Sequence, residues 1–241
     1  MNARTWSSIV VAAAALMMPA RAITAQGLEI KYVRDSETYA VLTRQVFRSA
    51  IESVRSWVAD AQAGGSWAVV LDVDETTLDN STYQLELGAY HKDYDEPSFN
   101  AWVARREAGV VPGVVEFIAA VRGMGGRVAW ISNRFEVSRE DTRVNLDMFG
   151  LWDEDDRLCL KSDPEYIKAD RRRDLASGEG ECAWVGTSIT VAAFLGDQMG
   201  DFPATGEPFP EAGDDSAFGT RFFMIPNPMY GPWSRRVTRR R

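Results

Sequence analysis

The feature that most constrains the fold is a short apolar run that ends in an acidic segment. Residues 67–71 read Trp-Ala-Val-Val-Leu, and the chain continues as Asp72-Val-Asp-Glu-Thr-Thr-Leu-Asp-Asn80. A strand with only apolar side chains is typical of a parallel sheet that helices cover on both faces. Charged residues that directly follow such a strand lie at the carboxyl edge of the sheet, where open α/β sheets bind ligands. We therefore predict an α/β fold with a functional site around this segment.

The rest of the chain repeats this rhythm of apolar runs and amphipathic stretches. Further strands are predicted at residues 127–131, 158–160, 190–195 and 221–225. Helices are predicted from their periodicity at residues 112–124, 138–149 and 167–176. Strands that alternate with helices predict a Rossmann-like parallel sheet with helices on both faces.

Two stretches fall outside the alternation. Residues 28–63 have helical periodicity and are predicted to form one N-terminal helical segment. Residues from about 81 to 110 are polar and aromatic, and we interpret them as a small, mainly helical cap over the mouth of the sheet. We predict a single domain over residues 23–241, with a basic tail at 234–241 that is solvated or, as a minor alternative, attached to an anionic surface.

The N-terminus resembles an export signal. Arg4 precedes an apolar run from Ile9 to Met18 that is too short to span a bilayer, and Ala20-Arg21-Ala22 fits a small-x-small cleavage site. We predict a signal peptide at residues 1–22, a periplasmic or secreted protein, and no stable membrane insertion after cleavage. The alternative is a buried N-terminal helix.

Charge and cysteine content restrict the partners. A formal net charge of −8 argues against binding to a nucleic acid polymer, although a nucleotide-sized substrate fits a small positive site on an acidic protein. Cys159 and Cys182 are the only cysteines, and the sequence leaves open whether they form a disulfide or stay free. The oligomeric state is open as well, a homodimer included.

A single histidine, His91, excludes several hydrolytic chemistries. Dinuclear metallophosphatases need several histidine ligands, and a phosphohistidine mechanism usually needs a second histidine or a matched acid. The chain has no G-x-S-x-G elbow and no G-x-x-x-x-G-K-[ST] loop. If the protein is a hydrolase, carboxylates must carry the chemistry.

Four strand ends supply suitable groups. Asp72 and Asp74 are two residues apart and point to the same side, where they repel each other unless a cation or proton intervenes. Mg²⁺ suits such an oxygen-rich site, and Asp197 and Asp201 follow another strand as further ligands or supports. Each piece alone is ordinary loop chemistry, but they occur in order, each directly after an apolar strand.

The same groups suit phosphoryl transfer. A carboxylate such as Asp72 can attack phosphorus and form an acyl phosphate, while a second, Asp74, acts as general acid and then base. Ser132, with nearby backbone N–H groups, and Lys161 are candidate donors to the phosphoryl oxygens.

These segments resemble the haloacid dehalogenase (HAD) superfamily, and within it the class C bacterial acid phosphatases of subfamily IIIB. The resemblance is carried by Val70-Leu-Asp-Val-Asp-Glu-Thr-Thr-Leu-Asp-Asn80, Val128-Ala-Trp-Ile-Ser-Asn-Arg134, Lys161 and Gly196-Asp-Gln-Met-Gly-Asp-Phe202. It implies Asp72 as nucleophile and Asp74 as acid/base. It also implies Mg²⁺ held by Asp72, the Asp74 carbonyl and Asp197, with support from Asp201. The phosphoryl group would be held by Ser132, Asn133 and Lys161.

The resemblance further implies a broad phosphomonoesterase that favours 5′-nucleotides or aromatic phosphates. Tyr83, Trp102 and Tyr230 are candidates for stacking on such a substrate, with plain packing as the alternative. Gln198 departs from the asparagine that is frequent in the family. A dehalogenase is disfavoured because Asp74 is present, and a non-catalytic binding or storage protein on the same scaffold is the alternative of a different class.

Overall fold

The computed structural model describes residues 27–60 and 66–235. The predicted signal peptide at 1–22 and most of the basic tail lie outside the described residues. Within those ranges, no helix combines the length and the apolar character needed to cross a membrane.

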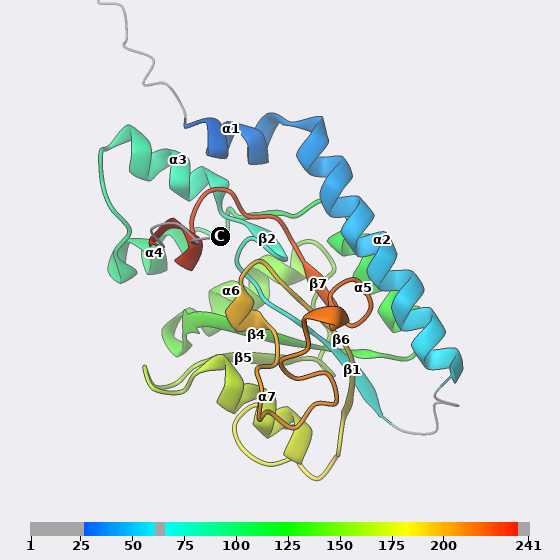
Figure 1. The fold of residues 1–241 in the computed structure, drawn as a ribbon. Coiled ribbons are helices and arrows are strands. Elements are labelled where there is room, and N and C mark those ends of the chain that lie inside the picture. Colours follow the sequence, from blue (N-terminus) through cyan, green and yellow to red (C-terminus); the bar gives the residue numbers. More distant parts are fainter. Residues whose placement is uncertain (1–26, 61–65, 236–241) are drawn as a thin grey trace, which may run out of the picture.

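Five parallel strands form the central sheet (Figure 1). They are β1 (Trp67–Leu71), β4 (Arg127–Phe135), β5 (Arg157–Lys161), β6 (Thr190–Gly196) and β7 (Phe222–Met224). The order across the sheet is β5-β4-β1-β6-β7, so β1 is central and pairs with β4 on one side and β6 on the other. All five strands predicted from apolar runs are confirmed, and β4 extends four residues beyond its predicted end at residue 131 because the chain stays extended to Phe135.

Helices cover both faces of the sheet, as predicted. Side chains of β1 alternate between two hydrophobic clusters, with Val69 and Leu71 in one and Ala68 and Val70 in the other. The first cluster includes residues from α2 (Glu37–Asp60), α5 (Val114–Gly123) and α6 (Arg139–Asp147). The second cluster includes Leu175 of α7 (Lys168–Ser177), together with long connecting segments. Period-two alternation in β1 therefore places the sheet between two apolar layers.

The predicted helical segment at 28–63 is two helices over its described part, residues 28–60. It breaks at Ser36, which has an extended backbone (ψ 119°) and separates α1 (Leu28–Asp35) from α2. The hydroxyl of Ser36 accepts a hydrogen bond from the N–H of Tyr39 at 3.3 Å, as a helix-capping serine does. This local bond competes with continuation of α1, and apolar periodicity alone does not reveal it.

The cap lies between two short antiparallel strands, β2 (Leu78–Asp79) and β3 (Gly109–Val110). It contains α3 (Ser81–Ala89) and α4 (Glu96–Val103), and the Asp95 carboxylate caps α4. Figure 1 shows α3 and α4 at the same end of the molecule as the C-terminal turn η4 (Pro232–Arg235). Three more 3₁₀ turns are η1 (Glu136–Ser138), η2 (Met199–Asp201) and η3 (Asp215–Ala217).

The two cysteines pair. Cys159 in β5 and Cys182, which follows α7, form a disulfide with their Cα atoms 5.4 Å apart. The bond joins the sheet to the segment between α7 and β6, and it answers a question that the sequence left open.

Candidate active site

The acidic residues gather where β1 and β6 end. The N–H of Asp72 donates to the carbonyl of Leu195 at 3.0 Å, so the first residue after β1 is still held against β6. The hydroxyl of Thr77 donates to the carbonyl of Asp72 at 2.8 Å and closes the following turn. Glu75 lies within this turn at a positive φ of 59°. A tight turn after β1 thus fixes the backbone of the acidic segment.

Three carboxylates converge at this point. Asp72, Asp197 and Asp201 each offer an oxygen, and these oxygens lie within 4.8 Å of one another. The approach of Asp201 depends on Gly196, because a Cβ at that position would lie 2.2 Å from the Cβ of Asp201. The ammonium of Lys168 bridges two of the three, at 2.5 Å from Asp72 Oδ1 and 2.6 Å from Asp201 Oδ1.

Burial and mutual repulsion govern the charges of this cluster. Burial raises the pKa of Asp72 well above its usual range, the nearby Lys168 opposes that shift, and the neighbouring aspartates add to it. Burial, together with the charge of Asp201, also raises the pKa of Asp197 to about 6. Burial by itself lowers the pKa of Lys168, but Asp201 and Asp72 outweigh it and raise the pKa overall. The cluster therefore attracts cations.

Asp74 is oriented differently, toward a buried arginine. Its Oδ1 accepts hydrogen bonds from Arg134 Nη2 at 2.8 Å, from Arg134 Nε at 3.0 Å and from Asn80 Nδ2 at 2.8 Å. Its Oδ2 is 3.3 Å from Ser132 Oγ. The side chain of Asp74 is 18% exposed, whereas that of Arg134 is 1% exposed. A fixed cation thus holds a carboxylate that remains accessible.

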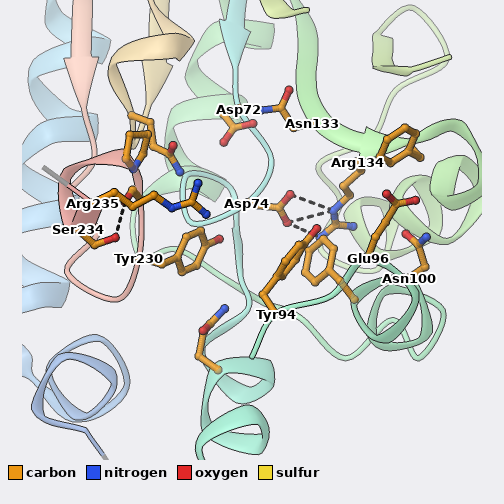
Figure 2. Close-up of a pocket in the computed structure, with 16 residues that line it drawn as sticks. Asp72, Asp74, Tyr94, Glu96, Asn100, Asn133, Arg134, Tyr230, Ser234 and Arg235 are labelled. Carbon is orange, nitrogen blue, oxygen red and sulfur yellow. Dashed lines mark hydrogen bonds and ion pairs between the residues drawn. The ribbon is translucent and has the colours of Figure 1, made fainter. Parts of the chain in front are cut away.

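Asp72 and Asp74 line one cavity of about 560 Å³. Figure 2 shows Tyr230 and Arg235 on one side of Asp74, and Tyr94, Glu96 and Asn100 on the other. The walls therefore come from the cap and the C-terminal turn, while the floor comes from the strand ends. The remaining lining residues are Gln84, Phe99, Asn133, Arg134, Phe135, Gln198, Gly231, Pro232 and Ser234.

The three aromatic candidates lie in different surroundings. Tyr230 lines the cavity. Tyr83 is 3% exposed and Trp102 is 2% exposed, and neither is among the lining residues. Their rings pack within the cap, with centroids 6.2 Å apart, and so offer no free face for stacking. The cavity aromatics that the sequence analysis did not predict are Tyr94 and Phe99 of the cap and Phe135 at the end of β4.

The predicted phosphate-binding residues are only partly brought together. Asn133 lines the cavity, and its Oδ1 accepts a hydrogen bond from Arg171 Nη2 at 3.1 Å. Ser132 is fully buried, and its hydroxyl faces Asp74. The ammonium of Lys161 lies 5.6 Å from the ring centroid of Phe135 and is not among the cavity-lining groups.

The lysine in contact with Asp72 is Lys168, which the sequence reasoning did not select. Lys161 directly ends an apolar strand and therefore attracted the assignment, whereas Lys168 is the first residue of α7. Six residues lie between the two lysines, and the path of that connection decides which lysine reaches Asp72. The sequence signal for Lys168 is its place in the first turn of a helix that follows a strand.

The donor set fits a divalent cation. Asp197 Oδ1 is buried and has no hydrogen-bond partner among the described residues, which is costly unless a cation or water occupies its free side. Asp197 Oδ2 accepts from Asn227 at 2.8 Å and from the Gln198 side chain at 3.4 Å, so this carboxylate is oriented. The Gln198 N–H also donates to Asp201 at 2.8 Å, and an all-oxygen carboxylate set suits Mg²⁺.

Comparisons with known proteins agree on one family. A family model described as HAD superfamily, subfamily IIIB (acid phosphatase), matches residues 7–233. The stem 31 kDa glycoprotein of Glycine max is 23% identical over 167 residues, and acid phosphatase 1 of Solanum lycopersicum is 26% identical over 161. Both alignments cover 67% of this chain, but the chain spans only 58% and 57% of these relatives.

Solved structures agree as well. The class C acid phosphatase from Bacillus anthracis superposes with a TM-score of 0.71 at 26% identity, covering 86% of both chains. The crystal structure of the class C acid phosphatase from Bacillus anthracis with tungstate bound gives a TM-score of 0.68 at 25% identity, again over 86% of both chains.

Proposed function

The chain belongs to subfamily IIIB of the HAD superfamily, the acid phosphatases, and on that premise we propose that it hydrolyses phosphomonoesters through an aspartyl-phosphate intermediate. The observation that carries the proposal is the pair of carboxylates, Asp72 and Asp74, on the floor of one cavity. We assign Asp72 as the nucleophile and Asp74 as the general acid and base. Lys168 against Asp72 favours the ionised carboxylate, which is the form that attacks phosphorus, and so opposes the effect of burial.

The two steps follow from these roles. In the first, an oxygen of Asp72 bonds to phosphorus while the bond to the leaving oxygen breaks, and Asp74 donates its proton to that oxygen. In the second, Asp74 removes a proton from water, which attacks phosphorus and displaces the Asp72 oxygen. Phosphate leaves, and both aspartates return to their initial states.

Donors around the cavity floor hold the phosphoryl oxygens in this proposal. Asn133 contributes its side chain, while Ser132 and Lys168 contribute from the adjoining buried layer. Lys161 stays a candidate for the same role.

We further propose Mg²⁺ as the cofactor, held by Asp72, Asp74 and Asp197 with support from Asp201. The converging oxygens and the partnerless Asp197 Oδ1 support this assignment. A bound cation would offset the negative charge that phosphate brings to this carboxylate cluster.

The cavity supports a planar leaving group. Tyr230 lies on one side and Tyr94 with Phe99 on the other, so aromatic faces are available for an aryl group or a nucleobase. We propose 5′-nucleotides and aryl phosphates as the favoured substrates. Tungstate, bound in the Bacillus anthracis structure, should compete with them.

We also propose that the protein is exported. The Cys159–Cys182 disulfide supports this, because disulfides persist mainly in oxidising compartments such as the periplasm. The predicted signal peptide at 1–22 agrees with that location.

The mechanism is tested with p-nitrophenyl phosphate, with and without EDTA, in wild type and in Asp72→Asn. We expect EDTA to stop turnover and Asp72→Asn to lower kcat roughly a thousandfold or more, as removal of a nucleophile does. Asp79→Asn is the matched control, because Asp79 is in the same acidic run but caps the N–H of Ser81 at 2.8 Å. Full activity in Asp72→Asn would overturn the mechanism. A wild type that is inactive at every pH would favour a binding or storage protein.

A further inference from the structure

The two oxygens of Asp74 are held unequally. Oδ1 accepts three hydrogen bonds from nitrogen donors at 2.8–3.0 Å, one from Asn80 and two from Arg134. Among the described residues, Oδ2 has only two contacts, each of 3.3 Å, to Ser132 Oγ and Arg134 Nε. Oδ1 is therefore the anchored atom, and Oδ2 is the atom with spare capacity to hold a proton.

A residue of the cap fixes the orientation of Asn80. The indole N–H of Trp102 donates to Asn80 Oδ1 at 2.9 Å, and Asn80 Nδ2 then donates to Asp74. An indole nitrogen only donates and a carboxylate only accepts, so the amide has one satisfactory orientation between them. Asn80 is fully buried and Trp102 nearly so, which makes loss of either bond costly.

A residue of α6 fixes the orientation of Arg134. Arg134 Nη1 donates to Thr142 Oγ1 at 2.9 Å, and both residues are buried. Nη2 lies 3.4 Å from Asn80 Oδ1 as well as 2.8 Å from Asp74, so the two supports meet. A planar guanidinium that is bound at both ends cannot rotate freely, so it also fixes the orientation of Asp74.

We propose that Asn80 and Arg134, oriented by Trp102 and Thr142, are positioning residues that aim Oδ2 of Asp74 at the leaving-group oxygen. The proposal rests on the proposed function, in which Asp74 is the acid and base. It gives α4 of the cap a part in the chemistry, through a side chain that lines no part of the cavity.

The proton path is explicit. As the Asp72 oxygen bonds to phosphorus and the ester bond breaks, the proton on Oδ2 moves to the leaving oxygen. The same Oδ2 then takes a proton from the attacking water as the bond between phosphorus and Asp72 breaks. Arg134 stays paired with Oδ1 throughout. Loss of one of the supporting hydrogen bonds would therefore misplace Oδ2 but leave the carboxyl group present.

The dependence of kcat/KM on the leaving group distinguishes a misplaced Asp74 Oδ2 from a general loss of protein stability. Protonation matters most for an alkoxide and least for p-nitrophenolate, which leaves readily without a proton. Trp102→Phe and Thr142→Val each remove one supporting bond. Thr142→Val preserves the shape of the side chain, whereas Trp102→Phe also reduces the ring volume. We expect both to lower kcat/KM roughly tenfold more for glycerol 2-phosphate than for p-nitrophenyl phosphate. Asp74→Asn sets the upper limit of this selective loss.

Matched controls remove a similar bond elsewhere. Trp130 Nε1 donates to Asp156 at 3.3 Å and Thr43 Oγ1 to the carbonyl of Ala40 at 3.3 Å, both at buried positions. Trp130→Phe and Thr43→Val should leave the ratio of the two kcat/KM values unchanged. The proposal fails if the ratio stays at the wild-type value in both network variants, or if the controls shift it equally. Should Trp102→Phe not fold, Thr142→Val decides. Failure of this kind in an active wild type leaves the proposed function standing.

Discussion

Lys168 shows how one residue sets the electrostatics of the site. It is the only lysine or arginine that the described residues place in an ion pair with Asp72, and it also contacts Asp201. Those two carboxylates raise its pKa above the lysine value of about 10.4. The raised pKa of Lys168 contributes stability that is present below about pH 10 and is lost as the pH rises beyond the folded-state pKa. At the acidic end the pair weakens as its carboxylates become protonated, which the raised pKa of Asp72 favours. Lys168 therefore stays charged across the working range of the protein.

Lys168→Met keeps the aliphatic volume and removes the charge. Two buried carboxylates then lose their shared partner, and we expect the free energy of unfolding to fall by about 3–5 kcal/mol in EDTA. Turnover should fall roughly a hundredfold or more, because a charged donor near the phosphoryl group is lost. Lys161→Met is the comparison, and it should change stability little because its ammonium contacts an aromatic ring and no carboxylate of the cluster. The measurements are urea unfolding and kcat for both variants. An equal loss of turnover in Lys161→Met would restore Lys161 as the principal donor.

At the scale of elements, the sequence predicted what local chemistry determines. Each strand of the sheet contains an apolar run. Asp72 and Asp197 directly follow β1 and β6, and Asp74 lies two residues after Asp72, so their meeting at one edge follows from the parallel order. The packing of loops and cap helices determines the positions of Lys168 and Tyr94 and the burial of Trp102. No periodicity encodes that packing, and a shift of one residue along a helix turns a side chain by about 100° around the helix axis. The cap was therefore predictable as a cap, but its lining was not.

Helix α5 illustrates how an element is tied to its neighbour. Gly113 caps its start at a φ of 103°, and a Cβ there would lie 3.0 Å from the Cα of Arg44 and from Cδ2 of Phe47 in α2. Gly123 ends the same helix, with nothing within 4 Å of an added Cβ. We expect Gly113→Ala to destabilise the protein by about 1–3 kcal/mol through backbone strain and crowding. Gly123→Ala should stabilise it by about 0.5–1 kcal/mol. Thermal unfolding of the two variants measures the sign of each change in melting temperature. Two changes in the same direction would contradict the contact between α2 and α5.

At the scale of the whole molecule, the fold and the cation are expected to be linked. Strands β1 and β6, which form the centre of the sheet, end in carboxylates that repel one another. Folding brings them together, whereas the unfolded chain keeps them apart. A divalent cation that binds only this arrangement must therefore stabilise the folded state.

Mg²⁺ should raise the melting temperature of the protein, measured against EDTA in the absence of substrate. At a concentration one hundred times Kd the gain is about 2.7 kcal/mol, which for a domain of this size corresponds to roughly 5–10 °C. Asp197→Asn removes the charge from the carboxylate with the partnerless oxygen, so it should abolish most of the shift. Asp214→Asn is the control, because Asp214 is exposed and only caps Ser216 at 2.8 Å, and it should retain the full shift. An unchanged shift in Asp197→Asn would place the cation elsewhere. Because the readout is unfolding, it tests the metal site whether or not the right substrate is known.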